Sequence, residues 1–179
     1  AALVRELLVE GANPDARNKD GLTPIMCVSS PDGEADRDIC SALVEAGADL
    51  AAVDNDGDSV LHDACFGFES DEECQNLRVL IGWGAPVNHA NNEGKTALFV
   101  ATEGGHSAFA TRAIEILLEE GALVSHRSND GSTSLLYPAD WGYMGVAKVL
   151  VAAGVDLDAQ DEHGWTALMV ACHSGRTDV

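Results

Sequence analysis

The sequence has few basic residues and no long apolar run. Ten Lys and Arg stand against thirty Asp and Glu in 179 residues, which leaves a formal net charge of −20. A field of that sign repels nucleic acid and anionic membrane surfaces and favours basic partners. No apolar run approaches the roughly 20 residues that cross a bilayer, and no signal-peptide pattern opens the chain. We therefore expect a soluble protein with no nucleic-acid binding and no membrane insertion.

Cysteines are also few, and their spacing does not pair them. The sequence holds five, an odd number with no close pair, and it has no Asn-x-Ser/Thr acceptor. Disulfide frameworks belong to oxidising compartments, so this pattern favours a reducing setting. We expect a cytoplasmic protein, with the nucleus left open. The chain starts at Ala1 inside the apolar pattern AALVRELL, which predicts a segment of a longer protein.

Glycine, by contrast, is abundant and regularly spaced. Five glycines end apolar stretches with helical spacing, such as ICSALVEAG and AKVLVAAG, and another glycine follows each of them ten residues later. The first glycine of each pair suits the left-handed turn that ends a helix. The second closes a turn in which Asp or Asn supplies local hydrogen bonds. The pairs are Gly11 and Gly21, Gly47 and Gly57, Gly84 and Gly94, Gly121 and Gly131, and Gly154 and Gly164.

A hydroxyl residue follows the second glycine by two positions in every copy. Such residues predict N-caps of a second helix, so the repeating unit is hairpin, helix, turn, helix. One helix pair of this kind cannot bury its own apolar face, and the units must therefore stack into a nearest-neighbour solenoid. The five predicted N-caps are Thr23, Ser59, Thr96, Thr133 and Thr166.

The repeat decides how the stretch DNDGDSVLHDAC, residues 54–65, is interpreted. Its alternating acids suggest a cation cage, but sister copies replace them, for instance with Asn91 and Ser128. In a calcium loop the glycine follows the third acidic position, and here Ser59 follows it. We interpret the stretch as a turn that opens a helix.

The stretches DGLTPIMCV, DGDSVLHDA, EGKTALFVA, DGSTSLLYP and HGWTALMVA resemble the ankyrin repeat, whose fingerprint is Thr-Pro-Leu-His-x-Ala in a unit of about 33 residues. The resemblance covers the whole chain. It implies an all-α repeat solenoid, a stack of hairpin-helix-turn-helix units with short β-hairpin turns. It also implies a single array over residues 1–179, with a partial repeat at 1–17, whole repeats at 18–53, 54–90, 91–127 and 128–160, and a partial repeat at 161–179.

Two positions bear on how well the repeats match the fingerprint. Only His62 keeps the fingerprint histidine, which we interpret as structural, and Pro138 takes the small-residue position that Ala101 fills in the preceding copy. Counted from Thr133 as N-cap, Pro138 is about the first residue whose N–H a helix would use, so it should strain that helix without abolishing it. We predict that the repeat at 128–160 is the weakest.

By resemblance, an ankyrin array binds proteins through its turn tips and its inner helices, which line a concave groove. Trp165 and Trp141 are the candidate anchors, because binding hot spots are enriched in Trp, Tyr and Arg. The alternative for Trp141 is local packing with Tyr143 beside Pro138. Carried onto this sequence, the groove residues are Leu22, Asp56, Asp58, Phe66, Glu93, Lys95, Asp130, Asp140, Trp141, His163, Trp165 and His173.

A second candidate is an acidic ridge where the inner and outer helices of two repeats connect. The stretches PDGEADRD and GFESDEECQ carry eight acids and one base. They could dock a basic segment of a partner, and such binding would weaken with salt; the alternative is a merely solvated charged face. The ridge residues are Asp32, Glu34, Asp36, Glu69, Asp71, Glu72 and Glu73.

Catalytic, metal-binding and cofactor-binding motifs do not occur in the sequence. There is no phosphate loop, no ligand cluster and no nucleophile motif. The thiol–imidazole neighbours are His62 with Cys65 and Cys172 with His173, at positions where cysteine usually acts as a small buried hydrophobe. We therefore expect a protein that is not an enzyme and that binds no metal and no cofactor.

One modification site is implied by the resemblance alone. Asn88, in APVNHA, matches the hairpin asparagine of the family that can be hydroxylated, and Leu80 lies eight residues before it. Pro86 stands where the family prefers an acid, which departs from the pattern.

These patterns predict a protein–protein interaction module that binds a partner segment in its groove. Two alternatives remain open. The array could regulate or position a larger enzyme or membrane protein of which it is part, or it could be a structural element of a large assembly. Ankyrin folds carry many unrelated roles, so the choice among these depends on the site.

Overall fold

The computed structural model describes residues 1–28, 34–66, 70–104 and 108–176. Its elements, in chain order, are α1 (Ala2–Val9), η1 (Met26–Val28), α2 (Glu34–Glu45), α3 (Val60–Ala64), α4 (Asp71–Gly82), α5 (Ala97–Glu103), α6 (Ala108–Glu119), α7 (Leu136–Trp141), α8 (Met144–Ala152) and α9 (Ala167–His173).

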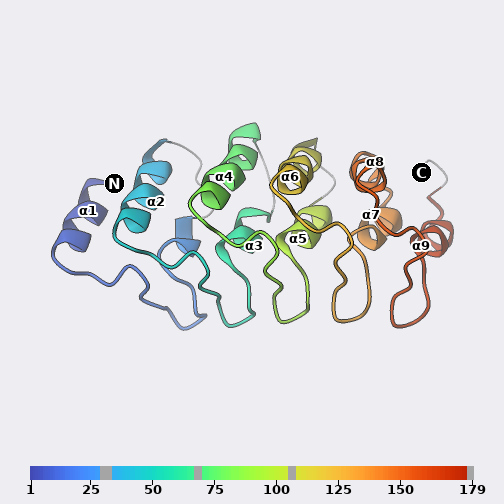
Figure 1. Cartoon of the computed structure of the whole chain (residues 1–179), viewed down its shortest axis with the longest axis horizontal. Coiled ribbons are helices and arrows are strands. Elements are labelled where there is room, and N and C mark those ends of the chain that lie inside the picture. The colour runs from blue at the N-terminus through green and yellow to red at the C-terminus, as the bar shows by residue number, and fades with distance from the viewer. Residues whose placement is uncertain (29–33, 67–69, 105–107, 177–179) are drawn as a thin grey trace.

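The helices form two rows with a third row of hairpin loops below them (Figure 1). The outer row holds α1, α2, α4, α6 and α8, and the inner row holds α3, α5, α7 and α9. Neighbours pack within each row, α4 on α6 and α6 on α8 in the outer one, α3 on α5, α5 on α7 and α7 on α9 in the inner one. The chain is therefore an all-α repeat solenoid, as predicted.

The core lies between the two rows and continues from one repeat to the next. Leu61 and Leu98 of the inner row and Leu77, Ile114 and Leu150 of the outer row are fully buried. Burying a side chain of this size contributes about 1.5–3 kcal/mol. Because no single helix pair encloses these side chains, the stacking itself stabilises the fold.

The hairpins are held by side chains rather than by strands. Asp54 Oδ1 accepts the backbone N–H groups of Asp56 and Asp58 at 2.9 and 2.8 Å. The acid at the start of DNDGD thus closes a turn, as expected. Within the described residues the hairpins contain isolated β-bridges, one between Val53 and Ser59 and one between residues 90 and 96, but no β-strand.

An asparagine ladder joins the tips of successive hairpins. The backbone N–H of Asn92 donates to the carbonyl of Asp56 at 3.0 Å, and its Nδ2 donates to the carbonyl of Asn55 at 3.1 Å. Asn55 and Asn129 repeat the pattern. Gly57 has φ +79°, and a Cβ there would lie 2.7 Å from Asn92 Oδ1, so both conformation and close approach require glycine.

The first inner element differs from the prediction of a full helix. Among the residues described up to position 28, the inner element is the three-residue 3₁₀ turn η1, and no α-helix follows Thr23 there. Residues 29–33 themselves are outside the described ranges.

The helix that contains Pro138 avoids the strain that we predicted. It begins at Leu136 instead of just after Thr133, so Pro138 is its third residue, where no N–H is needed. The later start leaves the hydroxyls of Thr133 and Ser134 buried without a hydrogen-bond partner within the described chain. In the last repeat, by contrast, the Thr166 hydroxyl accepts the N–H of Met169.

Candidate binding groove

A pocket opens between the second and third hairpins and the inner helices α3 and α5. We call it the acidic pocket, and its volume is about 300 Å³. Five carboxylates and one ammonium line it, which gives a net charge of −4 when all are ionised. The lining residues are Asp56, Asp58, His62, Asp63, Phe66, Asn91, Asn92, Glu93, Lys95, Val100 and Glu103.

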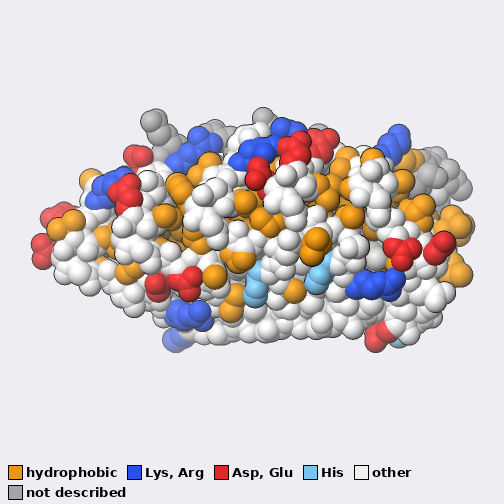
Figure 2. All heavy atoms as spheres, viewed as in Figure 1, with side chains coloured by type: hydrophobic (Ala, Val, Ile, Leu, Met, Phe, Trp, Pro, Cys, Tyr) orange, Lys and Arg blue, Asp and Glu red, His pale blue; other side chains and the backbone are white. Residues whose placement is uncertain are grey.

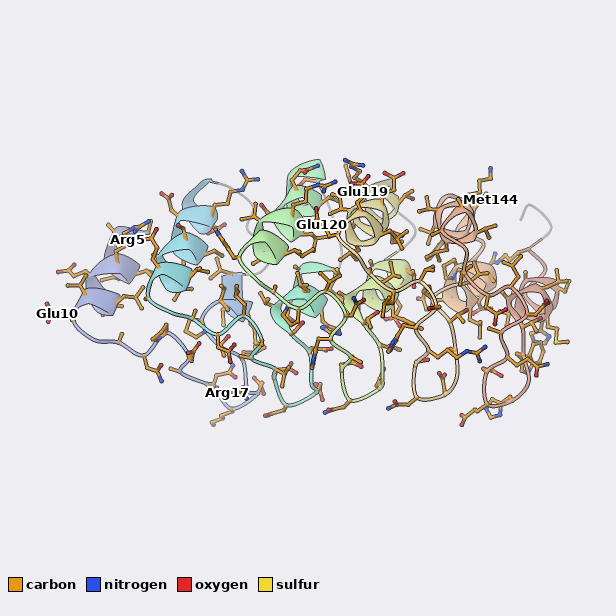
Figure 3. All side chains as sticks on the ribbon, viewed as in Figure 1. Arg5, Glu10, Arg17, Glu119, Glu120 and Met144 are labelled. Atoms are coloured by element: carbon orange, nitrogen blue, oxygen red, sulfur yellow. The ribbon has the colours of Figure 1, made fainter. Side chains whose placement is uncertain are left out.

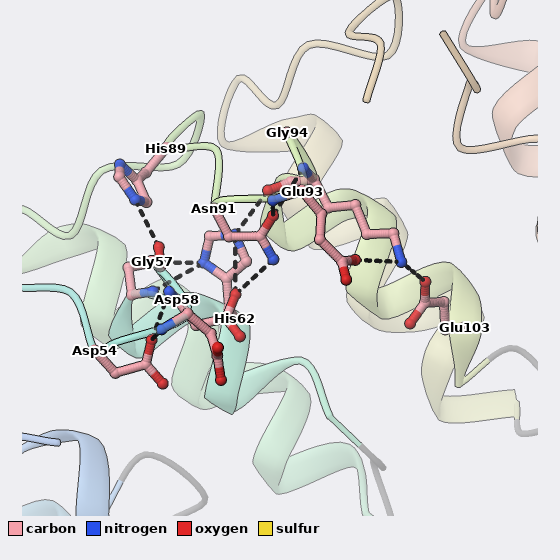
Figure 4. A network of polar contacts seen from close by, with 12 residues as sticks. Asp54, Gly57, Asp58, His62, His89, Asn91, Glu93, Gly94 and Glu103 are labelled. Carbon is pink, nitrogen blue, oxygen red and sulfur yellow. Dashed lines mark hydrogen bonds and ion pairs between the residues drawn. The ribbon is translucent and has the colours of Figure 1, made fainter. Parts of the chain in front are cut away.

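His62 holds the floor of this pocket as a neutral ring (Figure 4). Its Nδ1 accepts the backbone N–H of Ser59 at 3.1 Å, so its Nε2 carries the proton and donates to the carbonyl of Lys95 at 3.0 Å. Burial lowers the pKa of His62, and neither the Lys95 carbonyl nor the carboxylate of Asp58 reverses that shift. His62 therefore caps the start of its own helix, the structural role within the repeat that we predicted, and it also joins that repeat to the next one.

Asp63, on the inner helix α3, is an acid of this pocket that lies next to buried residues. Its Oδ2 is shielded from solvent and has no hydrogen-bond partner among the described residues. Burial, then the carboxylates of Asp54 and Asp58, raise the pKa of Asp63 to about 6. The chain thus keeps an uncompensated carboxylate facing the groove, at a cost in stability.

Lys95 and Glu103 form a wall between the acidic pocket and a second pocket. The ammonium of Lys95 lies 2.8 Å from Glu103 Oε1 and 2.9 Å from Glu93 Oε2. Partial burial opposes the charge, but the hydrogen bonds that the ammonium donates to Glu103 and Glu93 raise the pKa of Lys95. Both residues line both pockets, so the two pockets adjoin along the inner row.

The second pocket, which we call the central pocket, is less polar. Its volume is about 280 Å³, and it lies between α5 and α7. Thr133, only 2% exposed, places its unpartnered hydroxyl in the lining. The lining residues are Lys95, Phe99, Thr102, Glu103, Ser128, Asp130, Ser132, Thr133, Leu136, Tyr137, Asp140 and Val170.

Two acids at the edge of the central pocket are already engaged. Asp130 Oδ1 accepts hydrogen bonds from the hydroxyl of Ser128 and from the backbone N–H of Ser132. These hydrogen bonds lower the pKa of Asp130 although burial works in the other direction. Asp140 Oδ1 accepts from the hydroxyl of Ser174. The central pocket therefore offers less free negative charge than the acidic pocket.

Trp141 stands beside the central pocket on α7. Its ring is 50% exposed and stacks on Tyr137, with 6.0 Å between ring centroids and an interplanar angle of 27°. Tyr137 in turn contacts Tyr143 at 6.2 Å. The alternative from the sequence was that Trp141 packs directly on Tyr143. In the structure Tyr137 contacts both of these residues, and Trp141 stays half exposed.

Trp165 belongs to a separate, open pocket at the last repeat. It lines this pocket with His163, Met169 and Cys172, and its ring meets that of His173 edge-on at 5.3 Å. Of the groove residues predicted from the sequence, three therefore gather here, away from the acidic and central pockets.

The remaining groove residues are placed differently. Phe66, 78% exposed, stands at the rim of the acidic pocket. Asp56, Asp58 and Glu93 line the same pocket. Leu22 packs partly buried against the hydrophobic core, and it is not among the residues that line the acidic and central pockets.

The proposed acidic ridge is described only in part. Asp32 and Glu69 are outside the described residues, Glu34 and Asp36 fall in the first turn of α2, and residues 71–73 open α4. Acidic residues are favoured at helix N-termini by the helix dipole, which supplies a structural reason for their presence. Docking of a basic segment on this ridge stays a prediction.

The outer row carries charges of both signs. Arg78 of α4 pairs with Glu119, the last residue of α6, and with Glu120, which follows it. Figure 3 labels these two acids. In the space-filling view, acidic and basic side chains mix along the edge that the outer helices form (Figure 2). Among the described residues of this edge, Arg78 thus compensates the charges of Glu119 and Glu120.

The described residues offer little chemistry beyond binding. Burial raises the pKa of the Cys65 thiol, and His62 is engaged by backbone groups on both nitrogens. Asn88 donates to the carbonyl of Gly121 at 3.0 Å and accepts the N–H of Leu123 at 2.9 Å, so both ends of its amide join two repeats. In the described part of the chain no group of three His, Cys, Asp or Glu side chains could hold a metal ion.

No helix in the described residues is long and apolar enough to cross a bilayer.

Sequence reasoning missed Asp63 as a groove residue. The available signal was its register, because sister copies place Val100 and Val170 at the same position of the inner helix.

Comparison with known families gives a match over most of the chain. A family model described as ankyrin repeats, three copies, matches residues 1–77 and 69–161. No curated protein matches the sequence. The matched residues include the whole lining of the acidic pocket.

Proposed function

Because the chain belongs to the ankyrin-repeat family, whose members are generally protein–protein interaction modules, we propose that it binds a segment of a partner protein in the groove formed by the acidic and central pockets. The observation that carries this proposal is the adjacency of the two pockets across the Lys95–Glu103 pair. Together they make a continuous concave surface on three successive inner helices.

The residues beside this groove favour a role in binding a partner over a role in packing one repeat on the next. Phe66 and Trp141 are large, exposed side chains beside it, and interface hot spots are enriched in aromatic residues. The asparagine ladder keeps the hairpin tips at fixed positions, which reduces the ordering cost of binding. The array thus offers a preorganised surface for an extended segment.

Affinity capture from cell lysate tests the proposal. The wild-type chain is compared with a groove variant, Phe66→Ala with Trp141→Ala, and with an outer-row control, Val151→Ala, whose side chain is 47% exposed on α8. We expect a partner that the groove variant loses and the control keeps. A partner retained by the groove variant but eluted by salt would refute the groove and favour the acidic ridge.

A further inference from the structure

We propose that the acidic pocket seats an arginine side chain of the partner segment and that the central pocket seats an apolar side chain two or three residues away. This inference rests on the proposed function and specifies the chemistry that the groove recognises.

The first argument is the state of Asp63. Its Oδ2 is shielded from solvent yet accepts no hydrogen bond from the described residues. Such an oxygen makes the ionised side chain costly, because neither water nor a protein donor solvates it. A cation held in the acidic pocket would lower that cost by offsetting the charge of Asp63 together with the charges of Asp54 and Asp58, whose carboxylates raise the pKa of Asp63.

The second argument is the balance of charge in the acidic pocket. The ammonium of Lys95 is held between Glu93 and Glu103, so it does not compensate Asp56 or Asp63. Asp58 accepts a hydrogen bond from Asn91 Nδ2 at 2.7 Å, a neutral donor. The acidic pocket therefore keeps an excess of negative charge that one cationic side chain of a partner complements.

The third argument selects arginine over lysine. Phe66 exposes 78% of its surface at the rim, so it offers a ring face to a cation. A guanidinium is flat, stacks on aromatic rings and has five N–H donors, which suits a site with carboxylates on several sides. A lysine ammonium is a compact, strongly hydrated charge and would use the ring less well.

The central pocket accounts for the second side chain. Phe99, Leu136, Tyr137 and Val170 give it apolar walls. Packed helices lie about 8–10 Å apart. An extended chain advances about 3.3 Å per residue, so side chains two or three positions apart reach adjoining pockets.

A displayed library of random peptides tests this inference without a known partner. The library is selected against the wild-type chain, against Asp63→Asn and against Glu6→Gln, an acid on α1 far from the groove. Binding of the best synthetic peptide is then measured by calorimetry, with its arginine replaced by citrulline or by lysine. Citrulline keeps the shape of arginine and removes its charge.

We expect wild type and Glu6→Gln to select arginine with an apolar residue two or three positions away, and Asp63→Asn to lose the arginine preference. Citrulline should weaken binding at least about tenfold, since a hydrogen bond to a charged group is being replaced by a neutral one. Asp63→Asn removes an uncompensated charge and keeps the side-chain shape, so the variant should remain folded.

Three outcomes would overturn the inference, and they differ in what they say about the proposed function. Peptides that bind wild type, fail to bind a Trp141→Ala variant in the same calorimetry and show no arginine preference would refute the arginine site and leave groove binding intact. Selection of arginine that is unchanged on Asp63→Asn would also refute the site. A library that yields no peptide dependent on the groove would refute both proposals.

Discussion

Replacing Asp63 with Asn should stabilise the protein at neutral pH. In the fold, burial and the carboxylates of Asp54 and Asp58 raise the pKa of Asp63 from its ordinary 3.8 to about 6. One pKa unit corresponds to about 1.4 kcal/mol, so the ionised side chain costs at most about 3 kcal/mol. Because the side chain is partly open to solvent, screening reduces the expected gain to about 1–2 kcal/mol.

The sign of the pH dependence follows from proton binding. Between pH 4 and pH 6 the folded state holds the proton of Asp63 while the unfolded state has lost it, so the stability of the wild type falls as pH rises through this window. The penalty is complete above about pH 6.5. Asn cannot ionise, and the advantage of Asp63→Asn should therefore grow from pH 4 to pH 6.5 and then level off.

Urea unfolding at pH 5.0, 6.0 and 7.5 measures this difference. Asp56→Asn is the matched control, because it removes the same charge from an exposed position in the same repeat. We expect the free energy of unfolding to rise for Asp63→Asn at pH 7.5 by clearly more than for Asp56→Asn, and by about half as much at pH 5.0. Equal gains for the two variants, or a gain that does not change with pH, would refute the reasoning about Asp63.

The other predictions concern the repeats. Pro138→Ala should let the helix start just after Thr133, so that the Thr133 hydroxyl caps it and the protein is stabilised by about 1 kcal/mol. Unchanged helicity in circular dichroism would contradict this prediction. Gly57→Ala should cost about 2–3 kcal/mol in urea unfolding, because strain at positive φ adds to a clash, whereas Gly47→Ala, with no atom within 4 Å of the added Cβ, should cost about 1 kcal/mol. Amide hydrogens of α7 should exchange faster than those of α5, and equal protection would remove α7 as the weak point.

The repeating unit could be predicted because the rules behind it are local. A helix that ends at Gly47 or Gly84 needs a left-handed residue, and both glycines have positive φ as expected. The carboxylate of Asp54 closes its own turn by accepting the backbone N–H groups two and four residues further along the chain. Glycine spacing and the apolar stripes therefore determined the solenoid and its register without any long-range information.

The groove depends on contacts between repeats, and the sequence of a single repeat does not determine those contacts. Sequence reasoning placed Asp58, Lys95 and Phe66 near the groove from their register, but it could not show that Lys95 would pair with Glu103 and form a wall between two pockets. The structure packs Leu22, which the sequence assigned to the groove, partly against the hydrophobic core, and its place in the groove stays a prediction.

What the sequence by itself determined is the periodic part: hairpins, alternating helices and a stacked all-α array. Only the tertiary structure decided where the helix at Pro138 begins, which hydroxyls lose their partners, and that Asp63 faces the groove uncompensated. The physical reason is that solvent exclusion and charge compensation at Asp63 are set jointly by its own helix, by the turn at Asp54 and Asp58, and by the next repeat.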